Sequence, residues 1–234
     1  MVIVSGMADL IITIDGPAAS GKSTVARLLA RKLNASFLDT GAMYRAVTLA
    51  AMQAGVDLND EQKLLDITQT CEFQFSVKAG KMTVRIDNSD VTEQIRSPEV
   101  TANARYIAAA PRVREELVQM QRQFAADRHK IVTEGRDQGT VAFDDADVKI
   151  YLTADSAERA RRRQAELRAK GSAGSIEQIQ RAIEERDKSD ESRTVGPLKP
   201  AEDAIVVDTT NMSIEQVVEK LACYVKEGPH FAKM

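Results

Sequence analysis

The residues with the clearest chemical potential form one short segment that ends in Lys22 and Ser23. Residues 16–24 run Gly-Pro-Ala-Ala-Ser-Gly-Lys-Ser-Thr and match the G-x-x-x-x-G-K-[ST] pattern of a phosphate-binding loop. Its glycines let successive backbone N–H groups turn toward one anion, and a following helix adds partial positive charge. In such a loop the lysine reaches the β- and γ-phosphates and the hydroxyl binds Mg²⁺. The pattern predicts binding of a nucleoside triphosphate.

The sequence on either side of this loop has the pattern that the motif requires. The apolar run Leu10–Ile14 predicts a buried parallel strand before it. A helix is predicted after it by the helical spacing of Val25, Leu28, Leu29 and Leu33. We expect Lys22 to be exposed in a cleft at this strand–loop–helix junction.

Composition narrows the function classes. The chain has 234 residues and a formal net charge of −3, so no overall basic field favours nucleic acid or an anionic membrane. Cys71 and Cys223, with two histidines, show neither metal-ligand spacing nor a disulfide framework. No apolar run is long enough to span a membrane, and residues 1–7 lack the features of a signal peptide. We expect a cytoplasmic monomer with no nucleic-acid or membrane partner.

Alternation of strand and helix patterns predicts an α/β fold, a parallel sheet with helices on both faces. The strand signals fall at Leu10–Ile14, Ile131–Val132, Val148–Leu152 and Ala204–Val207. A different pattern interrupts them, because apolar and polar residues alternate over 73–77 and 82–86 with Ala-Gly between them. We interpret this as a half-buried β-hairpin within an inserted subdomain at 57–98 of a single domain, 1–234.

One helical stripe changes from apolar to charged. Its members, spaced by three or four residues, are Ile176, Ile179, Ile183, Arg186, Asp190 and Arg193. This spacing predicts one face of a single helix, whose charged half must emerge into water or a polar cleft. Two interpretations stay open: a frayed end or internal Arg–Asp–Arg ion pair, and a site wall for hydroxyls and phosphate.

A second set of arginines precedes a glycine- and serine-rich loop at 170–175. Arg159, Arg162 and Arg163 share a predicted helix face, where like charges repel each other unless an anion is present. A solvated surface helix is the ordinary explanation. Beside a phosphate loop, we favour a closing lid at 155–175 that lays arginines on a transferring phosphoryl group.

Two loops that follow predicted strands contain further candidate ligand-binding residues. Thr40 and Arg45 follow the short apolar element Phe37-Leu38, and Arg136 and Asp137 follow Ile131–Val132. Ligands of open parallel sheets bind outside the carboxyl ends of the strands, where both loops fall.

Five motifs occur together: G-P-A-A-S-G-K-S-T, D-T-G-A-M-Y-R, E-G-R-D-Q-G-T-V, R-D-x-x-D-x-x-R followed by P-L, and D-A-I-V-V-D-T-T. In order and spacing, from about Ala8 to Val225, the chain resembles the bacterial cytidylate kinase family. The resemblance implies a P-loop NTPase fold with an inserted β-containing subdomain and a helical lid. It also implies transfer of the γ-phosphoryl of ATP to CMP or dCMP, with Mg²⁺.

The resemblance assigns expected roles by matching position. ATP would be bound by Gly16, Pro17, Ala18, Ala19, Ser20, Gly21, Lys22, Ser23 and Thr24, with Ser23 on the metal. The acceptor would be bound by Thr40, Arg45 and Arg136 at its phosphate, by Arg114 and Asp137 at cytosine, and by Arg186, Asp190 and Arg193 around the ribose. The residues expected at the transferring phosphate are Lys22, Arg136 and Arg162. The chain has Arg105 where some members have a base-contacting serine.

Other functions remain open. A UMP or general pyrimidine kinase differs only in the base-reading contacts. A kinase for a non-nucleotide metabolite, such as a shikimate-type enzyme, offers no reason for the inserted hairpin. A nucleotide-dependent switch of the GTPase kind would need N-K-x-D, and the nearest string, Asp187-Lys-Ser-Asp190, lacks the asparagine.

Overall fold

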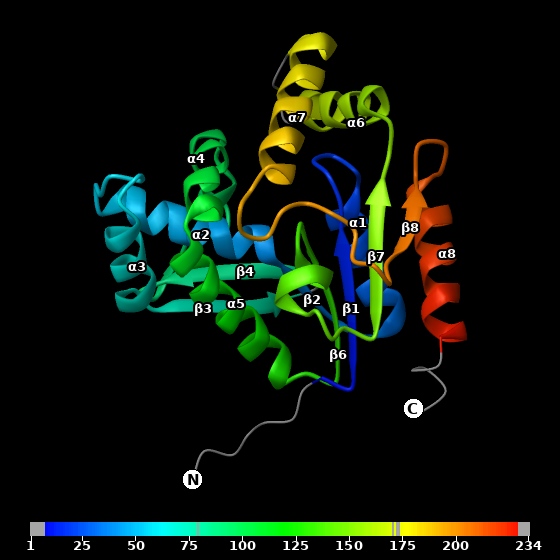
Figure 1. Ribbon diagram of the computed structural model, residues 1–234, viewed down its shortest axis with the longest axis horizontal. Helices are drawn as coiled ribbons and strands as arrows, with labels where there is room; N and C mark the ends of the chain where they lie inside the picture. The colour runs from blue at the N-terminus through cyan, green and yellow to red at the C-terminus, as the bar shows by residue number, and fades with distance from the viewer. Residues whose placement is uncertain (1–7, 79, 170, 172–173, 229–234) are drawn as a thin grey trace.

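Five parallel strands form the central sheet in the order β2-β6-β1-β7-β8 (Figure 1). The computed structural model describes residues 8–78, 80–169, 171 and 174–228. The strands are β1 (Leu10–Asp15), β2 (Ser36–Asp39), β6 (Lys130–Gly135), β7 (Val148–Thr153) and β8 (Ile205–Asp208). Each coincides with an apolar run of the sequence, so the predicted parallel sheet is confirmed.

Helices cover both faces of this sheet. One face carries α1 (Lys22–Leu33) and α8 (Ile214–Glu227), and the other carries α2 (Thr40–Gln53) and α5 (Pro111–Ala126). Leu10, Ile12 and Ile14 pack with the first pair of helices, whereas Ile11 packs with the second. A strand that is apolar on both sides is typical of a buried parallel sheet, and this one confirms the three-layer α/β prediction.

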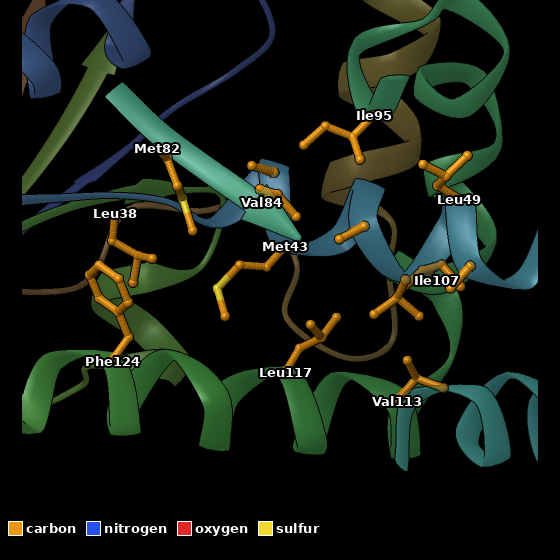
Figure 2. Packing of buried hydrophobic residues seen from close by; sticks show 14 of the residues in the cluster. Leu38, Met43, Leu49, Met82, Val84, Ile95, Ile107, Val113, Leu117 and Phe124 are labelled. Atoms are coloured by element: carbon orange, nitrogen blue, oxygen red, sulfur yellow. The ribbon is translucent and has the colours of Figure 1, made fainter. Parts of the chain in front are cut away.

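The predicted hairpin is also confirmed. It forms a second, antiparallel sheet of β3 (Phe73–Lys78), β4 (Lys81–Ile86) and β5 (Ser89–Asp90), next to α3 (Glu61–Thr70). Met82 and Val84 are buried and point into the core between α2 and α5, near Leu38 and Met43 (Figure 2). Its turn lies partly outside the described residues, since these omit Ala79.

The remaining elements surround the carboxyl ends of the strands. They are η1 (Gln94–Arg96), α4 (Pro98–Ala109), the helical turn η2 (Gln138–Ala142), α6 (Ser156–Ala169) and α7 (Ile176–Glu191). In Figure 1, α6 and α7 lie above the ends of β1 and β7. Ile179 and Ile183 of α7 pack against Ala160 and Ala18. Much of the predicted loop at 170–175 lies outside the described residues.

One sequence prediction about α7 is wrong. The stripe from Ile176 to Arg193 does not lie on a single helix, because α7 ends at Glu191 and Ser192 caps it. Arg193 therefore belongs to the following loop. Among the described helices, none has both the length and the apolar character needed to cross a bilayer.

Candidate active site

The phosphate loop leaves β1 through a glycine that no other residue can replace. Gly16 has φ 155°, and a Cβ there would collide with the carbonyl of Leu152 on β7. Gly21, with φ 88°, is the N-cap of α1. Between them the Ser20 hydroxyl is buried without a hydrogen-bond partner among the described residues. A helix N-terminus beside an unsatisfied buried donor fits an anion such as a nucleotide phosphate.

Lys22 differs from the prediction. Its side chain is buried and not exposed in a cleft. The side chain folds back onto the phosphate loop, where Nζ donates a hydrogen bond to the Pro17 carbonyl at 2.9 Å. Burial, together with repulsion from Arg136, holds the pKa of Lys22 well below its usual range. The ammonium group is thus already removed from water beside the phosphate loop.

A hydroxyl and a carboxylate that could bind a metal ion lie together where α1 begins. The Ser23 hydroxyl donates to Glu134 Oε1 at 2.7 Å, and Glu134 is the penultimate residue of β6. Burial, followed by repulsion from Asp39, raises the pKa of Glu134. A hydroxyl and a carboxylate are the hard oxygen ligands that Mg²⁺ accepts alongside phosphate oxygens. The described residues hold no group of three acidic, His or Cys side chains able to bind a metal unaided.

Glu134 was not predicted as a site residue. Its position at the carboxyl end of a strand adjacent to β1 was the available signal.

A buried ion pair fastens the loop to α6 and α7. Asp187 Oδ1 accepts the Ala18 N–H at 3.0 Å, and its other oxygen pairs with Arg159. Arg159 also donates to the Ala18 carbonyl at 3.0 Å. Arg159 is therefore buried and does not share an open lid face with the other two arginines. Asp187 lies one position off the helical stripe and was not predicted as a site residue.

The other two predicted lid arginines differ in position. Arg162 donates to the Thr209 carbonyl at 2.6 Å, and its Nη1 lies 3.4 Å from the Ser20 carbonyl oxygen. Arg163 pairs with Glu166 on its own helix at 2.9 Å. Only Arg162 of these two contacts the phosphate loop in the structure.

Across from the loop, Asp39 gathers two guanidinium groups. Nη2 of Arg45 and Nη2 of Arg96 lie 3.4 Å and 3.3 Å from Asp39 Oδ2. Arg45 Nε is buried with no hydrogen-bond partner among the described residues. Thr40 Oγ1 donates to the Glu134 carbonyl at 2.7 Å, which places the predicted acceptor-phosphate residues beside the loop. Arg96, from η1, was not predicted.

The pair expected to read cytosine is closed to solvent. Arg114 and Asp137 form an ion pair and are 2% and 4% exposed. The Arg114 guanidinium also lies over the Tyr44 ring, 5.6 Å from its centroid. Gly196, with φ 59°, packs so closely on the pair that a Cβ would overlap both side chains. Arg105 instead donates to Tyr106 Oη at 3.2 Å.

Asp190 joins two more of the predicted residues. It accepts from Arg136 Nε at 2.7 Å and pairs through its other oxygen with Arg193. Only part of the internal Arg186–Asp190–Arg193 ion pair that the sequence left open is present, because the second arginine on Asp190 is Arg136, from the loop after β6, instead of Arg186. Desolvation by the surrounding protein, then repulsion from Arg114 and Arg136, lowers the pKa of Arg193 to about 10.

Positive side chains from separate elements converge on the phosphate loop. Arg186 of α7 retains contact with solvent, and partial desolvation by the nearby protein, followed by repulsion from Arg136, Arg45 and Arg163, lowers its pKa to about 10. Repulsion from Arg136 and Arg186 likewise lowers the pKa of Lys22. Cations that repel each other at close range define a site for a highly charged anion.

Comparison with known proteins identifies the family of the chain. The family model described as cytidylate kinase matches residues 12–227. A cytidylate kinase from Limosilactobacillus reuteri is 48% identical over 217 residues, covering 92% of this chain and 95% of the relative. One from Rhodopirellula baltica is 47% identical over 218 residues, covering 93% of each.

Among solved structures, a shikimate kinase from Bacteroides thetaiotaomicron aligns over 93% of this chain and 98% of its own, with 12% identity and a TM-score of 0.46. The family model and the curated relatives span nearly the whole chain at high identity. The chain therefore belongs to the cytidylate kinase family.

Proposed function

We propose that the protein transfers the γ-phosphoryl group of ATP to CMP or dCMP, giving ADP and CDP or dCDP. The observation that carries this proposal is the convergence of Lys22, Arg136, Arg186 and Arg45 beside the phosphate loop. Two anionic nucleotides held in line need such charge, because the transition state spreads negative charge over the transferring group. Family membership supports cytosine as the base of the acceptor nucleotide.

Separate groups of the protein would bind the donor phosphates, the acceptor phosphate and the metal ion. The backbone of the loop and Lys22 would hold the donor phosphates, while Thr40, Arg45 and Arg136 would hold the acceptor phosphate. Ser23 and Glu134 offer the oxygen ligands for Mg²⁺, which when bound neutralises charge on the donor phosphates. An acceptor phosphate is already nucleophilic, so the reaction requires alignment more than a general base.

Movement of the acceptor-side subdomain, of the lid and of the segment around Gly196 would complete the site. In this proposal, residues 57–98 form the acceptor-side subdomain and residues 155–175 form the lid. The Arg114–Asp137 pair is covered by the segment around Gly196, so a base that reads both groups must displace that cover. Closure would exclude water, which otherwise hydrolyses ATP.

An acceptor panel tests the proposal. ADP formation is measured with CMP, dCMP, UMP, AMP, GMP and shikimate under identical ATP and Mg²⁺. CMP and dCMP should be the best acceptors, with UMP at least about tenfold lower in kcat/KM, because an unmatched hydrogen-bonding edge costs upward of ~1.4 kcal/mol. Equal rates with UMP, or a preference for a purine nucleotide or shikimate, would overturn it.

A further inference from the structure

Asp15 has a part in the site that its sequence position does not reveal. It is the last residue of β1, immediately before the phosphate loop, and is 4% exposed. Its carboxylate accepts the backbone N–H groups of Gln138 at 2.9 Å and Gly139 at 2.8 Å. These N–H groups open the helical turn η2, directly after Arg136 and Asp137.

The first N–H groups of a helical turn have no partner within the turn. Asp15 supplies that partner from a neighbouring strand, since β1 and β6 pair in parallel with Asp15 opposite Gly135. The Gln138 side chain is held as well, by the Thr133 hydroxyl at 2.7 Å and by Gln121 at 3.1 Å. The start of the turn is therefore fixed on both its backbone and its side chain.

We propose that Asp15 is a positioning residue for the acceptor nucleotide, which acts through Gln138 and Gly139 on Arg136 and Asp137. The inference rests on the proposed function, because it assigns those two side chains to the acceptor. Asp15 would touch neither nucleotide. Since it also precedes Gly16, one carboxylate sets the positions of the donor loop and the acceptor loop relative to each other.

The test compares Asp15→Asn with Asp147→Asn. Asp147 Oδ2 accepts the Ile11 N–H at 2.8 Å, so the control makes the same acid-to-amide change near the opposite end of β1 and keeps an acceptor oxygen for that N–H. In Asp15→Asn the introduced amide presents one oxygen and one NH₂, so one of the two N–H groups loses its acceptor.

We expect Asp15→Asn to raise the KM for CMP about tenfold or more and to lower kcat, with the KM for ATP changed less than about twofold. Asp147→Asn, whose amide oxygen can still accept the Ile11 N–H, should leave both KM values unchanged. Asp15→Ser, which keeps a single hydroxyl acceptor, gives a second variant should Asp15→Asn fail to fold. It should raise the KM for CMP about threefold or more.

Unchanged CMP kinetics in the folded variant would overturn the positioning role, as would an equal rise in both KM values. The wild-type acceptor panel separates this from failure of the proposed function. If CMP is not the preferred acceptor of the wild-type protein, the function fails. If it is, and Asp15 variants bind CMP normally, only the positioning role fails.

Discussion

At the scale of single residues, the charged groups of this site satisfy one another. Asp190 holds Arg136 and Arg193, and Asp137 holds Arg114, so side chains expected to bind substrate are already paired. An unpaired charge in such a buried position is costly, and mutual pairing removes that cost. Binding of an acceptor would exchange these pairs for contacts with phosphate, ribose and base.

Asp190→Ala should therefore change both affinity and stability. Loss of its hydrogen bonds should weaken use of CMP by about 1.5–3 kcal/mol, roughly tenfold to a hundredfold in kcat/KM. Removing the partner of Arg136 and Arg193 should also lower the free energy of unfolding by about 1–3 kcal/mol. Steady-state kinetics with CMP and calorimetric melting without nucleotide measure the two effects.

Glu185→Ala provides the control, because Glu185 is exposed on the same helix and should alter neither quantity. A large loss of stability with normal CMP kinetics would leave Asp190 with a purely structural role.

At the scale of elements, α6 and α7 are fastened to the phosphate loop as well as to each other. Arg159 of α6 and Asp187 of α7 bind the backbone of Ala18 from two sides, one at its C=O and the other at its N–H. The buried side chains Ala160, Ile179 and Ile183 extend this contact. Any lid movement must therefore occur around this junction or strain it.

Arg159→Met should destabilise the fold strongly, because it leaves the Asp187 carboxylate buried without its cation. The expected loss is about 3–5 kcal/mol in the free energy of unfolding, and the KM for ATP should rise because Ala18 lies in the loop. Urea unfolding and ATP kinetics test both parts.

Arg161→Met on the same helix is the matched control. Arg161 is 64% exposed and pairs with Glu158 at the surface, so its loss should cost less than about 1 kcal/mol. Similar losses for the two variants would show that the Arg159–Asp187 pair contributes no more than a surface pair.

At the scale of the whole molecule, the buried Asp15 carboxylate makes the free energy of unfolding depend on pH. Burial, reduced in part by hydrogen bonds from Gly139 and Gln138, raises the pKa of Asp15 from 3.8 to about 7. The Asp137 carboxylate raises it further and the Lys22 ammonium opposes the rise. Between these two pKa values the folded protein binds a proton that the unfolded chain does not, so stability falls as pH rises toward and through 7.

From pH 5.5 to 8, this group should lower the free energy of unfolding by about 2 kcal/mol, a loss that Asp15→Asn should not show. Urea unfolding of both proteins across this range gives the difference, in which titrations common to the two cancel. Parallel pH profiles for wild type and variant would contradict a raised Asp15 pKa.

The sequence by itself determined the parts of this protein that depend on local spacing. The phosphate loop needs Gly16, Gly21, Lys22 and Ser23 in order, and apolar runs and alternating residues are read directly as buried strands and a hairpin. The loops after strands were also predictable, because the carboxyl ends of parallel strands meet at one edge.

Only the tertiary structure decided which charges meet. Asp15 with the turn at Gln138, Asp187 with Ala18, and Glu134 with Ser23 are partners separated by more than 100 residues. No local period encodes such pairs, since they arise when strands far apart in the chain align. Burial was equally hidden, so Lys22 was expected to be exposed and is not. Desolvation depends on all the groups packed around a side chain in the fold, and neighbouring residues in the sequence do not determine which groups those are.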